Sequence, residues 1–163
     1  YKSDMGYIVS SVKVLTPDLK IITLTNNELN FHYRTSFLQQ NSNYICLEAI
    51  IKLKHGKKSE IEKVIKDRKA RRISSQPLEY PSAGSVFRNP SPELPSGKKI
   101  EDLGLKGLKK GGAQISDKHA NFIINTGNAT AKDIKELIEF VKKSVKEHYD
   151  IDLKVEQEFV NWE

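Results

Sequence analysis

The strongest constraint on the fold is a change in hydrophobic period near residue 57. Before it, Val12 and Val14 alternate with Lys13, which is typical of a half-buried strand. After it, apolar residues recur three and four positions apart, which is typical of an amphipathic helix. Strands followed by helices, rather than a regular alternation of the two, favour an α+β fold with a domain boundary near residue 57.

The first part of the chain predicts a small sheet. A hairpin is expected over residues 7–24, followed by a capping box of Thr25 and Glu28 that starts a short helical turn. Residues 44–53 are rich in isoleucine and predict a strand of mostly buried character. Cys46 lies in this run, so we expect a buried, inert thiol in a reducing compartment.

The second part predicts three helices, two strands and a loop. A capping box of Ser59 and Glu62 predicts a helix to about residue 72, and Thr130 with Asp133 predicts a long helix with an apolar stripe. Thr130 also completes a glycosylation acceptor pattern, but capping explains it better. The remaining expectations are a short helix over residues 96–104 closed by glycine, a loop over 105–112, and strands over 122–125 and 153–162.

Composition excludes several classes of protein. No apolar run approaches the roughly 20 residues that a membrane helix needs, and the four histidines and one cysteine have no metal-ligand spacing, so we predict no metal. The net charge of +6 weakly favours anionic partners. The basic run over residues 66–72 continues a helical pattern without aromatic residues, which favours a solvated helix face over a nucleic-acid surface. The sequence opens on Tyr1, with no secretory signal and no initiator methionine, which suggests a fragment.

The segment from residue 80 to residue 90, YPSAGSVFRNP, is the candidate functional segment. It places the hydroxyl of Ser85 directly after the small pair Ala83 and Gly84, which leaves room for a bulky ligand. Arg88 and Asn89 follow, and they could hold an anion or a sugar hydroxyl. The simpler alternative is a proline-bounded loop entering a strand, in which Ser85 only caps the backbone.

This segment resembles the active-site signature of the bacterial UDP-N-acetylenolpyruvylglucosamine reductase (MurB) family, and the likeness is closest to the shorter second type. Three other blocks resemble that family in the same order, so the resemblance covers nearly the whole chain. They are LNFHYRTS from residue 29, GGAQISDKHANF from residue 111 and NTGNATAKD from residue 125.

The resemblance implies a two-part architecture. Residues 1–56 would be the C-terminal part of a PCMH-type FAD-binding α/β domain, and residues 57–163 a compact α+β substrate-binding domain. The implied reaction is the NADPH- and FAD-dependent reduction of UDP-N-acetylglucosamine enolpyruvate to UDP-N-acetylmuramate, for peptidoglycan synthesis in the cytoplasm.

The resemblance also implies where the FAD-binding residues would lie. The glycine-rich segments that hold the FAD pyrophosphate in that family have no match in this sequence. We therefore expect the cofactor-binding residues mostly upstream of Tyr1, in an N-terminal half of the same protein. This chain alone should bind FAD poorly and be inactive.

Individual residues also take roles from the resemblance. Ser85 matches the proton donor, Arg34 the arginine that stabilises the developing enolate, and Glu156 an acid that assists protonation. A further set matches substrate contacts: Arg88, Asn89 and His119. Three of these residues also have simpler interpretations without a role in the reaction: a surface ion pair for Arg34, a solvated strand position for Glu156 and a core position for His119.

One departure from the family pattern concerns the C-terminal strand. Typical members read Glu-Val-Arg where this chain has Glu156, Gln157 and Glu158. On a regular strand the two acids would share a face, and each would raise the proton affinity of the other. We therefore expect weaker binding of an anionic substrate and a less certain role for Glu156.

Two other functions stay open from the sequence. The first is a module of the same fold that binds UDP-sugars without redox activity, for which a preparation without flavin absorbance would be the sign. The second is a basic nucleic-acid-binding protein, for which steeply salt-dependent binding would be the sign.

Overall fold

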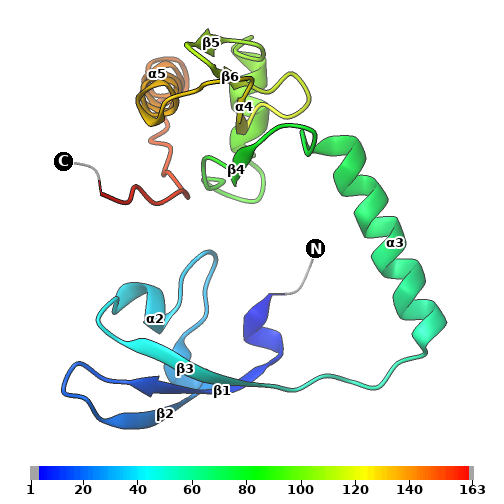
Figure 1. Ribbon diagram of the computed structural model, residues 1–163, viewed down its shortest axis with the longest axis vertical. Helices are drawn as coiled ribbons and strands as arrows, with labels where there is room; N and C mark the ends of the chain where they lie inside the picture. Colours follow the sequence, from blue (N-terminus) through cyan, green and yellow to red (C-terminus); the bar gives the residue numbers. More distant parts are fainter. Residues whose placement is uncertain (1–3, 162–163) are drawn as a thin grey trace. The chain divides into compact units, whose positions relative to one another are not determined.

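Two compact units make up the part of the chain that the structure describes, residues 4–161 (Figure 1). In this computed structural model one unit extends to Lys58 and the other begins at Ser59, and each is described here by itself. Both units contain helices and an antiparallel sheet, which confirms the expected α+β class. No helix among these residues is both long enough and apolar enough to cross a membrane.

Two expectations concern positions outside the described residues. Tyr1 lies outside the described residues. The expectation that most of the FAD-binding residues lie upstream of Tyr1 therefore stays a prediction. Trp162, the last residue of the strand predicted over 153–162, also lies outside the described residues.

The first unit is a three-stranded sheet with short helical turns at its edges. The strands are β1 (Val9–Leu15), β2 (Ile21–Thr25) and β3 (Ile45–Ile51), in the order β2-β1-β3. The turns are η1 (Met5–Tyr7), α1 (Asn26–Leu29) and α2 (Phe37–Gln40). The predicted hairpin is confirmed, and so is the capping box of Thr25 and Glu28.

The predicted burial of β3 is wrong. Every residue of this strand is exposed, and the free thiol of Cys46 is exposed with it. The strand lies at the edge of its sheet and pairs only with β1 among the described residues. The core of this unit instead gathers on β1 and α1, where Val14 and Leu29 are fully buried.

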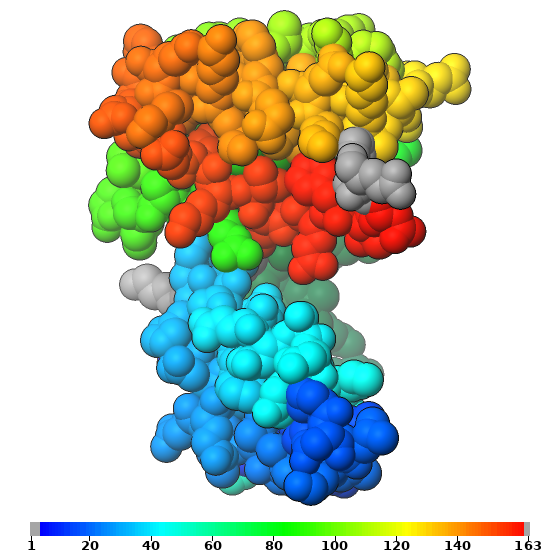
Figure 2. Space-filling model, turned by 90° about the vertical axis from the view of Figure 1, so that its left-hand side faces the viewer, coloured from blue at the N-terminus to red at the C-terminus, as the bar shows by residue number. Residues whose placement is uncertain are grey.

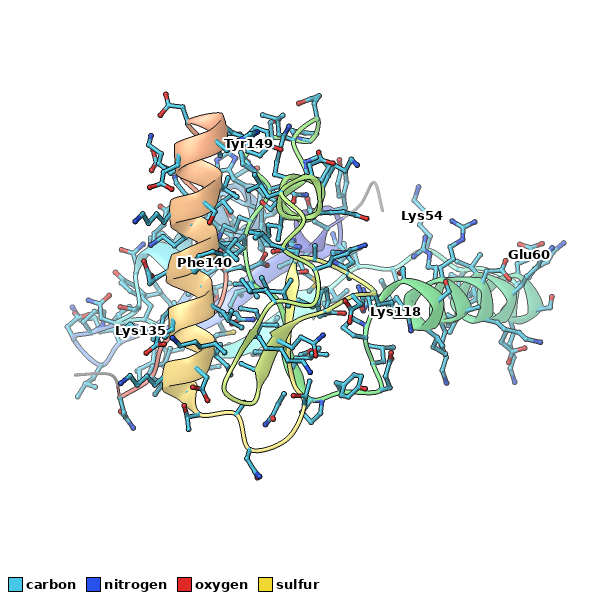
Figure 3. All side chains as sticks on the ribbon, turned by 90° about the horizontal axis from the view of Figure 1, so that it is seen from above. Lys54, Glu60, Lys118, Lys135, Phe140 and Tyr149 are labelled. Atoms are coloured by element: carbon cyan, nitrogen blue, oxygen red, sulfur yellow. The ribbon has the colours of Figure 1, made fainter. Side chains whose placement is uncertain are left out.

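The second unit starts with α3 (Lys58–Ser75), a helix that buries none of its residues. It begins before Ser59, so the predicted capping box is wrong, since Ser59 is already helical. The expected apolar stripe of Ile61, Val64 and Ile65 faces solvent. The side chains of α3 spread in all directions in Figure 3, where Lys118 lies near one end of the helix. Its ammonium group donates to the carbonyl oxygen of Ile73 over 2.8 Å.

A four-stranded antiparallel sheet and two helices form the rest of this unit. The sheet order is β4 (Ser82–Ser85), β7 (Phe122–Asn125), β6 (Ala113–Ile115) and β5 (Lys109–Lys110). β5 corrects the expected loop over residues 105–112. The helices are α4 (Ser96–Asp102), which Gly104 follows with a φ of 68°, and α5 (Ala131–Tyr149). The Thr130 and Asp133 capping box is confirmed at the start of α5.

The core of the second unit lies between this sheet and α5. The predicted apolar stripe of α5 is confirmed, since Leu137, Ile138, Val141 and Val145 are buried against Ile115 and Ile123 of the sheet, among others. The stripe forms because these positions are three and four residues apart on one helix face.

The strand predicted over residues 153–162 is absent from the part that is described, which ends at 161. In this segment, the described residues form only one isolated β-bridge, between Phe87 and Val155. Leu153 is buried, whereas residues 158–161 are exposed, so too few residues have a partner to form a ladder. Figure 2 shows this red segment on the surface of its unit, beside the orange residues of α5. Without the strand, there is no strand face for Glu156 and Glu158 to share.

Candidate active site

Ser85 is the last residue of β4, where the pairing of this strand with β7 becomes irregular. Gly84 has a φ of 81°, a conformation that other residues rarely adopt, and a Cβ built there would meet nothing within 4 Å. The expected open space beside the serine is therefore present. Val86 and Phe87 follow with 1% and 2% exposure, so the segment is anchored in the core directly after Ser85.

A pocket of about 300 Å³ brings together three of the six predicted site residues: Ser85, Asn89 and His119. They come from two blocks more than 20 residues apart in the sequence. The lining also includes charged and polar side chains that the sequence analysis missed, namely Lys98, Glu101, Lys118 and Asn121. No signal in the sequence distinguished these from ordinary surface residues, because only the fold gathers them.

His119 is half-buried in this pocket and is held from two sides. Its Nδ1 accepts a hydrogen bond of 3.2 Å from the backbone N–H of Asn121, and its ring packs edge-on against Phe122 at 4.9 Å. Burial lowers its pKa from the usual 6.5, and a hydrogen bond of its own backbone partly opposes this. Smaller effects come from Lys106, which lowers the pKa, and from Glu101, which raises it. Because Nδ1 is an acceptor, the proton of the neutral ring lies on Nε2.

Arg88 and Asn89 are held by the start of α4. The hydroxyl of Ser96 donates to the carbonyl oxygen of Arg88 over 2.6 Å, and the backbone N–H of Ser96 donates to Oδ1 of Asn89 over 3.1 Å. The Nε of Arg88 is buried and has no hydrogen-bond partner among the described residues. A buried donor without a partner is costly, which favours a ligand or a water at this position.

Glu156 belongs to the C-terminal segment that supports Ser85. Its backbone N–H donates to the carbonyl oxygen of Val86 over 2.8 Å, and the side-chain amide of Gln157 donates to the carbonyl oxygen of Gly84 over 3.3 Å. The residues on both sides of Ser85 are thus tied to this segment. The side chain of Glu156 is half-buried but does not line the pocket.

Arg34 belongs to the first unit and is described apart from the pocket. It lies in a tight turn closed by hydrogen bonds of 3.0 and 3.2 Å between the backbones of His32 and Thr35. Its φ of 56° is left-handed, which is costly for an arginine, and its guanidinium lies 5.1 Å from the centre of the Tyr33 ring. Leu19, in the turn between β1 and β2, has a similar φ of 61°, so the conformation alone does not distinguish Arg34, and its role stays a prediction.

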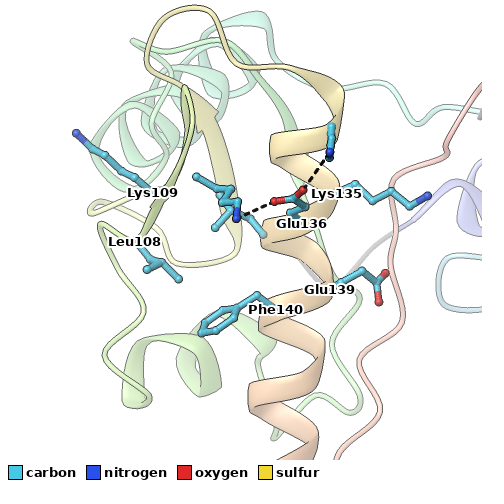
Figure 4. A pocket seen from close by; sticks show the side chains of 9 residues that line it. Leu108, Lys109, Lys135, Glu136, Glu139 and Phe140 are labelled. Carbon is cyan, nitrogen blue, oxygen red and sulfur yellow. Dashed lines mark ion pairs between the residues drawn. The ribbon is translucent and has the colours of Figure 1, made fainter.

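A larger hollow lies elsewhere on the second unit, between β5 and α5 (Figure 4). It measures about 670 Å³ and contains none of the predicted site residues. Its carboxylate Glu136 pairs with Lys110 at 2.9 Å and with Lys132 at 3.9 Å, so part of its positive charge is already neutralised. The smaller pocket beside Ser85 is therefore the better candidate for an active site.

The described residues contain no group of three or more side chains that could hold a metal ion. The groups gathered beside Ser85 are instead hydroxyl, amide, imidazole and ammonium, together with the carboxylate of Glu101, which pairs with Lys106 at 2.7 Å. These groups suit recognition of a polar ligand. Together with the fold, they define the class of this unit: an α+β domain with a polar pocket beside an edge strand of an antiparallel sheet.

Comparison with known proteins assigns this chain to a family. Residues 76–160 match the family profile described as UDP-N-acetylenolpyruvoylglucosamine reductase, C-terminal domain. A relative from Bacillus licheniformis that carries the reductase name is 44% identical over 158 residues, which cover 97% of this chain and 85% of that one. The chain belongs to the UDP-N-acetylenolpyruvoylglucosamine reductase family, which confirms the resemblance.

Other relatives are longer than this chain. The reductase of Anoxybacillus flavithermus is 47% identical over 158 residues, which cover 97% of this chain and 52% of the relative. The crystal structure of the Thermus caldophilus reductase (MurB) matches with a TM-score of 0.77 and 35% identity, over 94% of this chain and 53% of that one. The chain therefore spans about half the length of several curated relatives that it matches.

Proposed function

We propose that this chain is the C-terminal portion of an enzyme that reduces UDP-N-acetylglucosamine enolpyruvate to UDP-N-acetylmuramate with FAD and NADPH, in the cytoplasm, for peptidoglycan synthesis. The observation that carries the proposal is that Ser85, Asn89 and His119, from two separate family blocks, line one pocket. The names of the relatives supply the reaction. In this proposal residues 1–56 belong to the FAD-binding domain and residues 57–163 bind the substrate.

The groups that line a pocket of the first unit do not fit the pyrophosphate of FAD. The pocket that the first unit offers has a volume of about 360 Å³ and contains the acid Asp4 but no cation. Gly6 is its only glycine, whereas pyrophosphate sites use several backbone N–H groups and positive charge. This mismatch supports the proposal that the cofactor-binding residues lie mostly upstream of Tyr1. We therefore derive only the part of the reaction that concerns the substrate.

Three residues would act on the substrate during reduction. Addition of hydride to the enolpyruvyl double bond leaves negative charge on the adjacent carbon and its carboxylate, and that carbon must then receive a proton. Arg34 would hold the carboxylate and stabilise the developing enolate, since arginine stays charged and can form two parallel hydrogen bonds. Ser85 would donate its hydroxyl proton to the carbon, and Glu156 would assist that transfer.

Three more residues would hold the rest of the substrate. Arg88 has a buried Nε that lacks a partner among the described residues, and Asn89 lines the pocket with its amide. His119 would donate from Nε2 to an oxygen of the nucleotide-sugar. Lys98 and Lys118 also line the pocket, where they pair with Asp102 at 2.7 Å and with Glu79 at 3.4 Å. The charge that these pairs leave would suit a substrate that carries a diphosphate and a carboxylate.

The test is the Ser85→Ala variant of the full-length enzyme, with Ser82→Ala as the matched control. Ser82 is an exposed serine on the same strand and does not line the pocket. We expect Ser85→Ala to leave flavin reduction by NADPH unchanged but to slow reoxidation by the enolpyruvyl sugar at least about 100-fold, because the proton donor is lost. Stopped-flow absorbance of the flavin measures both steps.

Either of two outcomes would overturn this proposal. A normal reoxidation rate in Ser85→Ala would remove the role of the hydroxyl. A full-length protein that is colourless and indifferent to FAD, yet binds UDP-sugars, would support the non-redox binding module instead.

A further inference from the structure

Asn121 connects the two blocks that line the pocket. It is buried, with 5% exposure, and lies between His119 and β7. Its side-chain Oδ1 accepts from the backbone N–H of Phe87 over 3.0 Å, and its Nδ2 donates to the carbonyl oxygen of Phe87 over 2.8 Å. Its backbone oxygen accepts from the N–H of Val86 over 2.9 Å. One residue therefore fixes the two positions that follow Ser85.

The same residue holds the ring of His119. Its backbone N–H donates to Nδ1 of His119, and this bond places the proton of the neutral imidazole on Nε2. The ring lines the pocket, so Nε2–H is the donor that it can offer to a ligand. Asn121 is thus bonded both to the ring of His119 and to the two residues that follow Ser85.

We infer that Asn121 is a positioning residue, which aligns Ser85 for proton donation and keeps His119 as an Nε2–H donor toward an acceptor oxygen of the substrate. This inference rests on the proposed function for its catalytic part, whereas the geometry that it claims for His119 can be tested without catalysis. Asn121 does not itself act on the reacting atoms.

The sharpest variant is Asn121→Asp, tested across pH in the full-length enzyme. A protonated aspartic acid, like asparagine, both accepts and donates, so it can bond both polar groups of Phe87. An ionised carboxylate only accepts and would repel the carbonyl oxygen of Phe87. Burial beside that oxygen raises the pKa of the new carboxyl, so the protonated form persists toward neutral pH. The charged groups around this position are Lys98 and Glu101 from α4, Lys106, and Lys118.

We expect flavin reoxidation in Asn121→Asp to be about 100-fold slower than in the wild type at alkaline pH, since small misplacements of reacting groups cost about that factor. The ratio of variant to wild-type rate should rise as the pH falls, because protonation restores the missing donor. Flavin reduction by NADPH should stay normal. A ratio that does not change with pH, or a wild-type rate at every pH, would overturn the inference.

Asn125→Ala is the matched control. Asn125 ends β7, and its Oδ1 accepts from the backbone N–H groups of Gly127 and Ala129 over 2.9 and 3.1 Å. The variant removes two side-chain hydrogen bonds at the end of β7, the strand that directly follows Asn121, without touching Phe87 or His119. Its reoxidation rate per folded flavoprotein should equal that of the wild type, and an equal loss in both variants would mean that Asn121 is only structural.

The tautomer of His119 gives a readout that needs no enzyme activity. In the full-length protein labelled with ¹⁵N histidine, the His119 signals are assigned by their loss in His119→Gln. We expect Nε2 to carry the proton and Nδ1 to show the shift of a bare acceptor nitrogen. A proton on Nδ1, or an average of the two tautomers, would contradict the inference even if the enzyme proves to be a reductase. If the enzyme fails to reduce the substrate, this measurement still decides the geometry.

Discussion

At the residue scale, the candidate site depends on side chains whose polar atoms already have defined partners. Asn121 is bonded through both backbone and side-chain groups, Nδ1 of His119 is occupied, and Asn89 accepts from the start of α4. Groups held in this way have few alternative orientations. They therefore present their remaining donors to a ligand without a large cost of ordering on binding.

The lowered pKa of His119 makes a prediction about stability and pH. Its folded pKa lies below the usual 6.5 because burial disfavours the charged ring. The unfolded chain then binds a proton before the folded one does, so the contribution of His119 to stability is complete above about pH 6.5 and is lost as the pH falls from there toward the lowered folded pKa. We expect a steeper loss of urea resistance over this range in the wild type than in His119→Gln.

An NMR titration of the ring protons of His119 checks the cause of that slope. Its midpoint should lie below 6.5. Equal pH slopes of the wild type and His119→Gln, or a midpoint above the usual value, would show that burial does not control this histidine.

Single-residue features were predictable where a motif or a local pattern defines them. The resemblance located Ser85, Asn89 and His119, and these residues do share a pocket. The roles of Arg34, Arg88 and Glu156 stay predictions. Lys98 and Lys118 could not be found from the sequence, because surface lysines are common and only the fold places these two beside Ser85.

At the element scale, the contact between the β6–β7 sheet and the start of α5 leaves no space at Gly112. A Cβ at this position would overlap the carbonyl oxygen of Gly127 and would lie 2.5 Å from the backbone nitrogen of Ala129. Both obstacles are backbone atoms of the loop that leads into α5. Backbone atoms cannot relieve the overlap by a change of rotamer, as a flexible side chain could. The loop that leads into α5 would therefore have to shift away from the sheet.

We therefore predict that Gly112→Ala lowers the free energy of unfolding by at least about 2 kcal/mol, since overpacking against backbone forces a shift of whole elements. Gly104→Ala is the control, because its φ of 68° strains an alanine but nothing lies within 4 Å of the added carbon. Its cost should be about 1 kcal/mol. Urea unfolding measures both, and equal losses would mean that crowding at Gly112 is relieved easily.

Elements were predictable where local signals agree with tertiary packing. The Thr130 box and the stripe of α5 agree with a helix that covers a sheet, and this helix is where it was expected. β3 has the isoleucines of a buried strand but lies at a sheet edge, which composition does not reveal. The capping box predicted at Ser59 is wrong because the helix begins earlier. The strand predicted over residues 153–162 is wrong because its pairing is limited to an isolated bridge of Val155 with Phe87.

At the scale of the whole molecule, the chain consists of two units, and the helix that begins the second one is exposed along its length. The described part of the first unit has a small core, while Ile45, Leu47, Ile50 and Ile51 of β3 remain at the surface. The family could be inferred from four motif blocks, and the change in hydrophobic period near residue 57 predicted a domain boundary there. The degree of exposure could not, because it depends on what packs against each element.

Limited proteolysis should distinguish α3 from the helix that is anchored in the core. We predict that trypsin first cleaves between Lys63 and Arg72, because no residue of α3 is buried and local opening there disrupts little packing. Lys142 and Lys143 on α5 are the internal comparison, since four buried residues hold that helix in place. Mass spectrometry of the first fragments gives the order, and an earlier cut in α5 would contradict the prediction.

The exposure of α3 also affects how the chain responds to heat. An 18-residue helix without a buried face has little to stabilise it beyond its own backbone bonds and side-chain pairs. Its circular dichroism signal should fade gradually on warming, as in a free peptide, while the sheet and α5 of the same unit still give a sharp transition. A sloping baseline before that transition would thus record the melting of α3 alone, and calorimetry would detect almost no heat for it.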